Sequence, residues 1–143
     1  MQISKNFLLQ EFVPKAIYKL YEGKSTWFIN PKIIQIAQEL RYASGVPIII
    51  NNWHIGGVYN QSGYRVPETV IGAKLSQHKL GNAIDVRSNE VLPIELMNVV
   101  LSKKELFMQL GLTAIEDVTA TKSWLHLDCR FVPQQKEIII FKP

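Results

Sequence analysis

The spacing of apolar residues predicts helices in the first part of the chain and again near residue 100. The clearest helix covers residues 31–44, where apolar residues recur at helical spacing. Asn30 is a typical N-cap, Pro31 suits the first helical position, and Gly45 is a typical C-terminal stop. Shorter helical segments are predicted at 6–12, with Asn6 as N-cap, and at 16–21, 93–101 and 103–110.

Apolar runs and alternating patterns predict strands at 46–50, 83–86, 113–117, 124–131 and 137–141. The alternation is clearest in 124–131. One face carries Trp124, His126, Asp128 and Arg130, and the other carries Leu125, Leu127 and Cys129. Helices come mainly first and strands mainly later, which favours an α+β fold with helices packed on one face of an antiparallel sheet. We expect residues 1–143 to form a single domain.

A long polar segment, 51–69, interrupts this pattern and is predicted to be a loop. It is rich in asparagine and glycine, yet it retains large side chains such as His54, Tyr64 and Arg65. Loops held on a rigid scaffold are where binding groups concentrate. We therefore expect part of a functional site here.

Composition narrows the class of protein. A hydrophobic content of 47% with 20% charged residues is typical of a globular domain, and a single cysteine excludes an internal disulfide. The start of the chain has no signal-peptide pattern and no apolar run reaches membrane-spanning length, so we expect cytoplasmic synthesis and no membrane insertion. The net charge of +4 comes from scattered lysines, which argues against a nucleic-acid partner.

Two segments far apart in the chain carry typical zinc ligands. His78 and Asp85 flank a turn of small residues around Gly81, so a backbone reversal could bring their side chains together. His126 lies on the polar face of the predicted strand 124–131. Two imidazoles and a carboxylate would leave the fourth tetrahedral position of a zinc ion to water, as in catalytic zinc sites. We therefore predict a Zn²⁺ site formed by these three residues.

These segments resemble motifs of a known family. The pattern S-x-H-x-x-G-x-A-x-D covers 76–85, W-x-H-x-D-x-R covers 124–130, and S-G-Y-R covers 62–65. Together they are similar to the zinc D-alanyl-D-alanine carboxypeptidase family. That family comprises peptidoglycan peptidases, includes phage endolysins and shares its zinc-site architecture with the hedgehog signalling domain. The resemblance implies a hedgehog/DD-peptidase-like fold.

Carried over by position, the resemblance implies zinc ligands His78, Asp85 and His126. It suggests that Arg65 grips a substrate carboxylate or carbonyl, because a guanidinium can bond both carboxylate oxygens; the alternative is a solvent-facing loop arginine. The resemblance also suggests that Tyr64 and Trp124 line the substrate cleft, and that Ser76 either bonds the substrate or braces the loop that carries His78. For Tyr64 and Trp124, packing in the core is the alternative.

The chain departs from the family at one catalytic position. Many members have a glutamate three residues before the last histidine, whereas this chain has Ser123, which cannot act as a general base. The nearest upstream acids are Glu116 and Asp117, which point to opposite faces of a strand. We prefer Glu116 as the base because its side chain reaches further, and Asp117 stays open.

The expected function is that of a zinc metallopeptidase, a hydrolase of the carboxypeptidase or endopeptidase type. It would act as a monomer and cleave an amide of the peptidoglycan stem peptide. Cell wall degradation without a signal peptide suggests a phage or prophage lysin. The alternative is a catalytically weak or inactive zinc-containing binding module on the same fold, which Ser123 favours.

Overall fold

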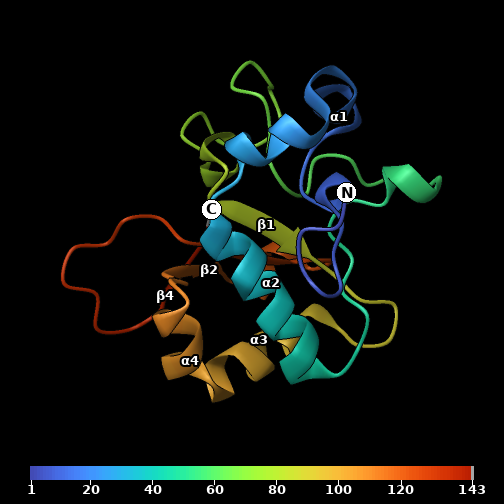
Figure 1. Ribbon diagram of the computed structural model, residues 1–143. Helices are drawn as coiled ribbons and strands as arrows, with labels where there is room; N and C mark the ends of the chain where they lie inside the picture. The colour runs from blue at the N-terminus through green and yellow to red at the C-terminus, as the bar shows by residue number, and fades with distance from the viewer. Residues whose placement is uncertain (143) are drawn as a thin grey trace.

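A mixed four-stranded sheet lies at the centre of the computed structural model, which describes residues 1–142 (Figure 1). The strand order is β1-β3-β2-β4. β3 pairs antiparallel with both β1 and β2, whereas β4 pairs parallel with β2. The strands are β1 (Ala83–Val86), β2 (Ala114–Glu116), β3 (Leu125–Asp128) and β4 (Ile139–Phe141).

The prediction of an antiparallel sheet is therefore correct for three strands and wrong for β4. Both neighbours of β3 are already in place, so the chain that leaves β3 can pair only at an edge of the sheet. It reverses direction once and adds β4 at the free edge of β2. Because β2 runs opposite to β3, a strand that has reversed relative to β3 runs parallel to β2.

Helices cover the apolar face of this sheet. Leu125 and Leu127 of β3 are fully buried in one apolar core with residues of α2 and α3, such as Leu40 and Leu96. No helix within residues 1–142 has the length and apolar character needed to cross a membrane. The helices are α1 (Lys15–Tyr21), α2 (Pro31–Ser44), α3 (Pro93–Ser102), α4 (Lys104–Gln109) and α5 (Val118–Thr121).

The limits of α2 are those predicted from its capping residues. The Asn30 side chain accepts a hydrogen bond from the Lys32 backbone N–H, and Pro31 begins the helix. Gly45 ends it with a φ of 71°, a left-handed conformation that glycine adopts at little cost. Capping chemistry is local, which explains why the sequence was enough to place both ends.

The prediction of a helix over 6–12 was only partly right. The structure has a short 3-10 helix there, Leu9–Glu11, with Leu8 rather than Asn6 at its N-cap. The backbone N–H and the side-chain oxygen of Asn6 are both engaged by the amide of Gln38 in α2. The long-range contact with Gln38 thus occupies the Asn6 side chain, which the local pattern predicted to cap a helix.

The prediction of a strand over 46–50 was wrong. This segment makes one isolated bridge, between Ile49 and Arg87, with backbone hydrogen bonds of 2.8 and 3.0 Å. Ile48 and Ile50 are buried, as their apolar character suggested. Pro47 cannot donate to a ladder, and Arg87 lies just beyond the end of β1. Burial was thus predicted correctly, but pairing was not.

Candidate metal centre

The sheet register places two of the predicted ligands directly opposite each other. Asp85 of β1 pairs with His126 of β3, so both side chains project from the same face of the sheet. That face is the one opposite the helices. His78 reaches the same point from the 3-10 helix Gln77–Leu80, which leads through Gly81 into β1.

Gly81 is the residue that allows this turn. Its φ is 70°, and a Cβ atom there would lie 1.9 Å from the Phe28 carbonyl oxygen. The Gly81 carbonyl accepts a hydrogen bond of 3.0 Å from the Asn30 N–H. The turn is therefore packed closely against Phe28 and Asn30, just before α2. These backbone contacts hold Gly81 in position and, with it, the adjoining 3-10 helix that carries His78.

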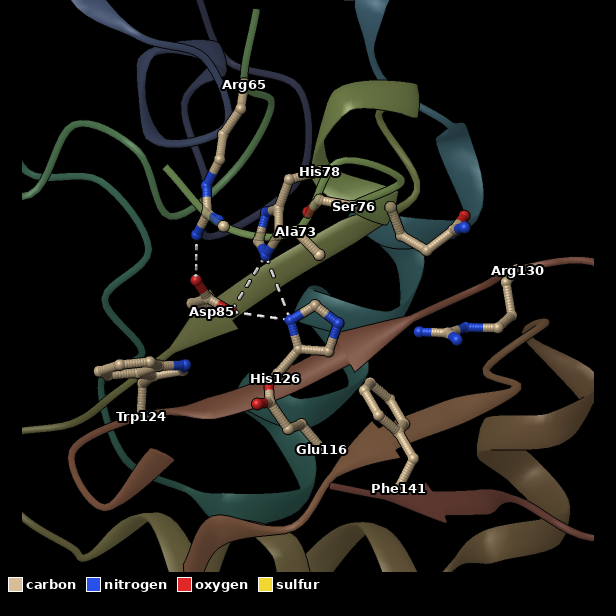
Figure 2. Close-up of a pocket in the computed structure, with 12 residues that line it drawn as sticks. Arg65, Ala73, Ser76, His78, Asp85, Glu116, Trp124, His126, Arg130 and Phe141 are labelled. Carbon is tan, nitrogen blue, oxygen red and sulfur yellow. Dashed lines mark hydrogen bonds and ion pairs between the residues drawn. The ribbon is translucent and has the colours of Figure 1, made fainter. Parts of the chain in front are cut away.

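The three predicted ligands converge on one point (Figure 2). His78 Nε2 lies 3.1 Å from Asp85 Oδ1 and 3.2 Å from His126 Nδ1, and His126 Nδ1 lies 2.9 Å from Asp85 Oδ1. All three residues are buried, with exposures of 2%, 5% and 6%. Donors on a tetrahedral ion with bonds of about 2.0–2.1 Å lie roughly 3.3 Å apart, so the spacing suits such an ion.

Hydrogen bonds on the far side of each ring decide which nitrogen faces the centre with a lone pair. His78 Nδ1 lies 2.7 Å from the Gly63 carbonyl oxygen, and His126 Nε2 lies 3.1 Å from Asp128 Oδ2. Both partners are acceptors, so these ring nitrogens carry the protons. The nitrogens that remain point at each other and at a carboxylate oxygen. Such a set of acceptors needs a cation at its centre, and the residues fit a metal ion.

The ionisation behaviour of the cluster leads to the same conclusion. Burial raises the pKa of Asp85, but the two imidazoles outweigh this and hold it well below its usual range. Burial lowers the pKa of His78. Burial also disfavours charged His126, yet hydrogen bonds to Asp128 and Asp85 raise its pKa to about 9. Without a metal, a proton on His126 is therefore the cation that the cluster holds.

The S-G-Y-R segment braces these ligands. Besides the Gly63 carbonyl, the Ser62 carbonyl accepts the Asp85 N–H at 2.7 Å, and the Arg65 N–H donates to the His78 carbonyl at 3.0 Å. Arg65 Nη2 bonds Asp85 Oδ2 at 2.6 Å, leaving Oδ1 to face the centre. Partners of this kind fix ligand orientation and commonly affect metal affinity.

The centre opens into a cavity of about 260 Å³. Its lining includes Arg65, Ser76 and Trp124, three of the residues that the resemblance associated with substrate. Figure 2 shows Arg65 and Trp124 on one side of the ligands and Arg130 with Phe141 on the other. The predicted ligands and most of the predicted contact residues therefore share one pocket.

The register also places the two acidic candidates differently relative to the cavity. Ala114 of β2 pairs with Asp128 and Ile115 with Leu127, so Glu116 lies level with His126 on the same face. Glu116 lines the cavity, and partial burial raises its pKa. Asp85, His126 and Glu116 thus form a row across three neighbouring strands.

Asp117 has a different role, which corrects its place among the catalytic candidates. Its carboxylate caps α5 by accepting the Thr119 N–H at 2.9 Å. It also lies 3.9 Å from the Lys142 ammonium. Successive residues of a strand point to opposite sides, so the placement of Glu116 in the cavity directs Asp117 away from it.

Tyr64 does not wall the cleft. It is 9% exposed and stacks on Phe28, with ring centroids 5.1 Å apart, in a separate hollow of the surface. Its neighbour Arg65 turns toward the metal centre instead. The core-packing alternative was therefore right for this tyrosine.

The sequence assigned no role to Asp128, Arg130 or Phe141. Asp128 is fully buried, orients His126 and accepts hydrogen bonds from Arg130 Nε and Nη2. The Arg130 guanidinium lies 4.5 Å from the centre of the Phe141 ring. Alternation with His126 in the predicted strand 124–131 was a signal for the first two residues. No pattern in the sequence pointed to Phe141, because it reaches the site only through the parallel pairing of β4 with β2.

Comparison of the chain with models of protein families, with curated proteins and with solved structures gave no match.

Proposed function

We propose that this protein is a zinc-dependent peptidase that hydrolyses an amide bond of the peptidoglycan stem peptide. The observation that carries the proposal is the convergence of two imidazole lone pairs and one carboxylate oxygen, 2.9–3.2 Å apart, beside the carboxylate of Glu116 in an open cavity. Zinc is the metal for which two histidines and one carboxylate are a common catalytic set.

The chemistry of the metal and that of the chain complement each other. A zinc ion in such a site polarises a substrate carbonyl and lowers the pKa of water to about 7. Glu116 would take a proton from the attacking water and pass it to the leaving amine, the role of a general base and then a general acid. Its raised pKa, caused first by burial, suits a group that must both accept and release a proton.

Arg65 supports the reaction in two ways in this proposal. Its Nη2 is committed to Asp85, so the arginine holds this ligand in place. Its Nη1 lies beside Gly72 on the cavity wall and makes no hydrogen bond within residues 1–142. That nitrogen is available for a carbonyl or carboxylate of the substrate, and Trp124 supplies an aromatic wall next to it.

The proposal includes the fold family and the biological setting. The order of the three motifs supports a hedgehog/DD-peptidase-like fold, and the ligands that these motifs contribute meet at one centre. We propose a monomeric lysin of phage or prophage origin that acts on the bacterial wall.

Zinc content is the first test. We expect one zinc ion per chain in the wild-type protein and loss of that ion in His78→Ala, measured by elemental analysis after dialysis. The wild type should release D-alanine or stem-peptide fragments from purified wall, detected by mass spectrometry. A protein that binds no zinc would rule out the proposal.

The role of Glu116 has its own test. Glu116→Gln should lower turnover by about 10²–10⁴-fold and leave zinc bound, because general acid–base catalysis contributes on this order. Asp117→Asn is the matched control, since it removes a carboxylate that caps α5 outside the cavity. Full activity in Glu116→Gln together with loss in Asp117→Asn would show that the base was misassigned.

Ser123 favours a second function, a zinc-containing module that binds the stem peptide without cleaving it. This residue stands where many members of the resembled family have their catalytic glutamate. Bound zinc, measurable affinity for the peptide and no fragment release by the wild type would favour this alternative.

A further inference from the structure

Arg87 is a half-buried cation without a counter-ion. It forms no ion pair with a carboxylate in residues 1–142. Its Nη1 donates to Ser62 Oγ at 3.0 Å and approaches the Ile50 carbonyl at 3.5 Å. Within the same residues Nε and Nη2 have no protein partner. Neither nitrogen is among the buried polar atoms without a partner, so both reach the solvent-filled cavity that Arg87 lines and are open to a ligand.

The position of Arg87 relates it to the metal centre. It follows Asp85 by two residues, just beyond β1, and extended-chain alternation places both side chains on the same face. Two residues of extended chain span roughly 7 Å. The register that pairs Asp85 with His126 and Val86 with Leu125 brings Arg87 level with Trp124. Arg87 and Trp124 therefore form the next row, just beyond the paired residues of β1 and β3, and both line one cavity.

A second cavity, of about 470 Å³, opens at this row. Arg87 and Tyr59 lie in its wall, and it shares Arg65, Asp85 and Trp124 with the cavity at the metal centre. The two cavities are therefore parts of one cleft that continues past the ligands. The Arg87 guanidinium lies 4.0 Å from the centre of the Tyr59 ring, which holds its plane in position.

From this geometry we propose that Arg87 binds a carboxylate of the substrate peptide, one or two residues away from the bond that is cut. The inference depends on the proposed function and adds a substrate class to it: peptides with a free acid on the Tyr59 side of the cleft. The spacing follows from the roughly 7 Å between the rows, since an extended peptide advances about 3.3–3.6 Å per residue. A guanidinium with two free N–H groups suits a carboxylate, which can accept both.

Two carboxylates of the wall peptide have the required chemistry, the α-carboxylate of a γ-linked D-glutamyl residue and the C-terminal carboxylate. Three synthetic stem pentapeptides distinguish them: one with both acids free, one with the glutamyl acid amidated, and one with the C-terminus amidated. Binding is measured by calorimetry with zinc-loaded Glu116→Gln protein, so that affinity is measured separately from turnover.

We expect one of the amidated peptides to bind about 10- to 100-fold more weakly than the free acid, as a charge-assisted hydrogen bond implies. Whichever amide weakens binding identifies the carboxylate. In the same background, Arg87→Gln should abolish the difference between the peptides. Arg41→Gln, in α2, removes the same charge outside the two cavities of the cleft and should preserve the difference.

Arg87 also contacts Ser62 and Ile50, so a structural role must be separated from ligand binding. Arg87→Lys keeps the charge and should retain part of the preference, even if Arg87→Gln folds poorly in thermal melts. Equal binding of all three peptides to the Glu116→Gln protein that retains Arg87 would overturn the carboxylate site and leave the peptidase proposal standing. Failure to bind any of the peptides would overturn both.

Discussion

Replacement of Asp128 by asparagine tests how His126 is held. The fully buried carboxylate accepts a hydrogen bond from His126 Nε2 at 3.1 Å and one from Arg130 Nε at 2.8 Å. Asparagine has one acceptor oxygen and one NH₂ group, so it cannot accept from both partners in the same way. Arg130 loses its ion pair in either orientation of the amide, and when the NH₂ group faces His126, Nε2 also loses the acceptor that keeps its proton there.

The expected effect has two parts. A proton shifted to Nδ1 would occupy the lone pair that faces Asp85 and His78, and loss of such a ligand-orienting partner typically weakens metal binding 10- to 100-fold. That loss corresponds to roughly 1.4–2.7 kcal/mol of binding free energy. The free energy of unfolding of the metal-free protein should also fall, by about 1–3 kcal/mol, because a buried acceptor loses hydrogen bonds; the remaining Arg130 is partly exposed and keeps access to water.

Competition with a chromophoric zinc chelator at pH 7.5 measures the first part, and urea unfolding in the presence of a chelator measures the second. Asp117→Asn is the control, since its carboxylate lies at the start of α5 and should not affect zinc affinity. Asp128→Ala removes the acceptor in every orientation, so a zinc affinity within twofold of wild type for both Asp128→Asn and Asp128→Ala would refute the assignment of Nδ1 as the ligand atom of His126.

Three further outcomes follow from the structure. The metal-free protein should lose up to about 3 kcal/mol of unfolding free energy as pH rises from about 6.5 to 9, because the pKa of His126 is about 9 in the folded state and near 6.5 in the unfolded state. Urea titrations at several pH values measure this loss. A urea midpoint that does not change with pH would contradict the prediction. Gly81→Ala should cost clearly more stability than Gly56→Ala in thermal melts. Both have positive φ, but only at Gly81 does a Cβ meet the Phe28 carbonyl, at 1.9 Å, so equal costs would argue against the packed turn. Leu127→Ala, in the central strand, should lower the unfolding free energy by about 2–5 kcal/mol without altering zinc stoichiometry, and loss of zinc from the folded variant would contradict this.

Residues whose role depends on near neighbours were predicted well from sequence. The ends of α2 follow from Asn30, Pro31 and Gly45, whose capping and turn preferences need no tertiary information. The two faces of β3 follow from alternation, which separated His126 from the buried Leu125 and Leu127.

Residues whose role depends on a distant partner were predicted less well. Tyr64 was associated with the cleft, but Phe28 provides it with a stacking partner elsewhere. Asn6 was predicted to cap a helix, but Gln38 occupies its polar groups. In each case a contact made across the fold replaced the one suggested by adjacent sequence.

The α+β class, the helix ends and the ligand types of the candidate centre could be predicted from sequence. Burial periodicity, caps and ligand types are properties of single segments. The tertiary structure alone decided that Glu116 rather than Asp117 faces that centre, that Arg65 is committed to Asp85, and that Arg87 and Trp124 share the adjoining row. The physical reason is register. Which side chains meet across a sheet depends on how separate strands pair, and a pattern within one strand does not contain that information.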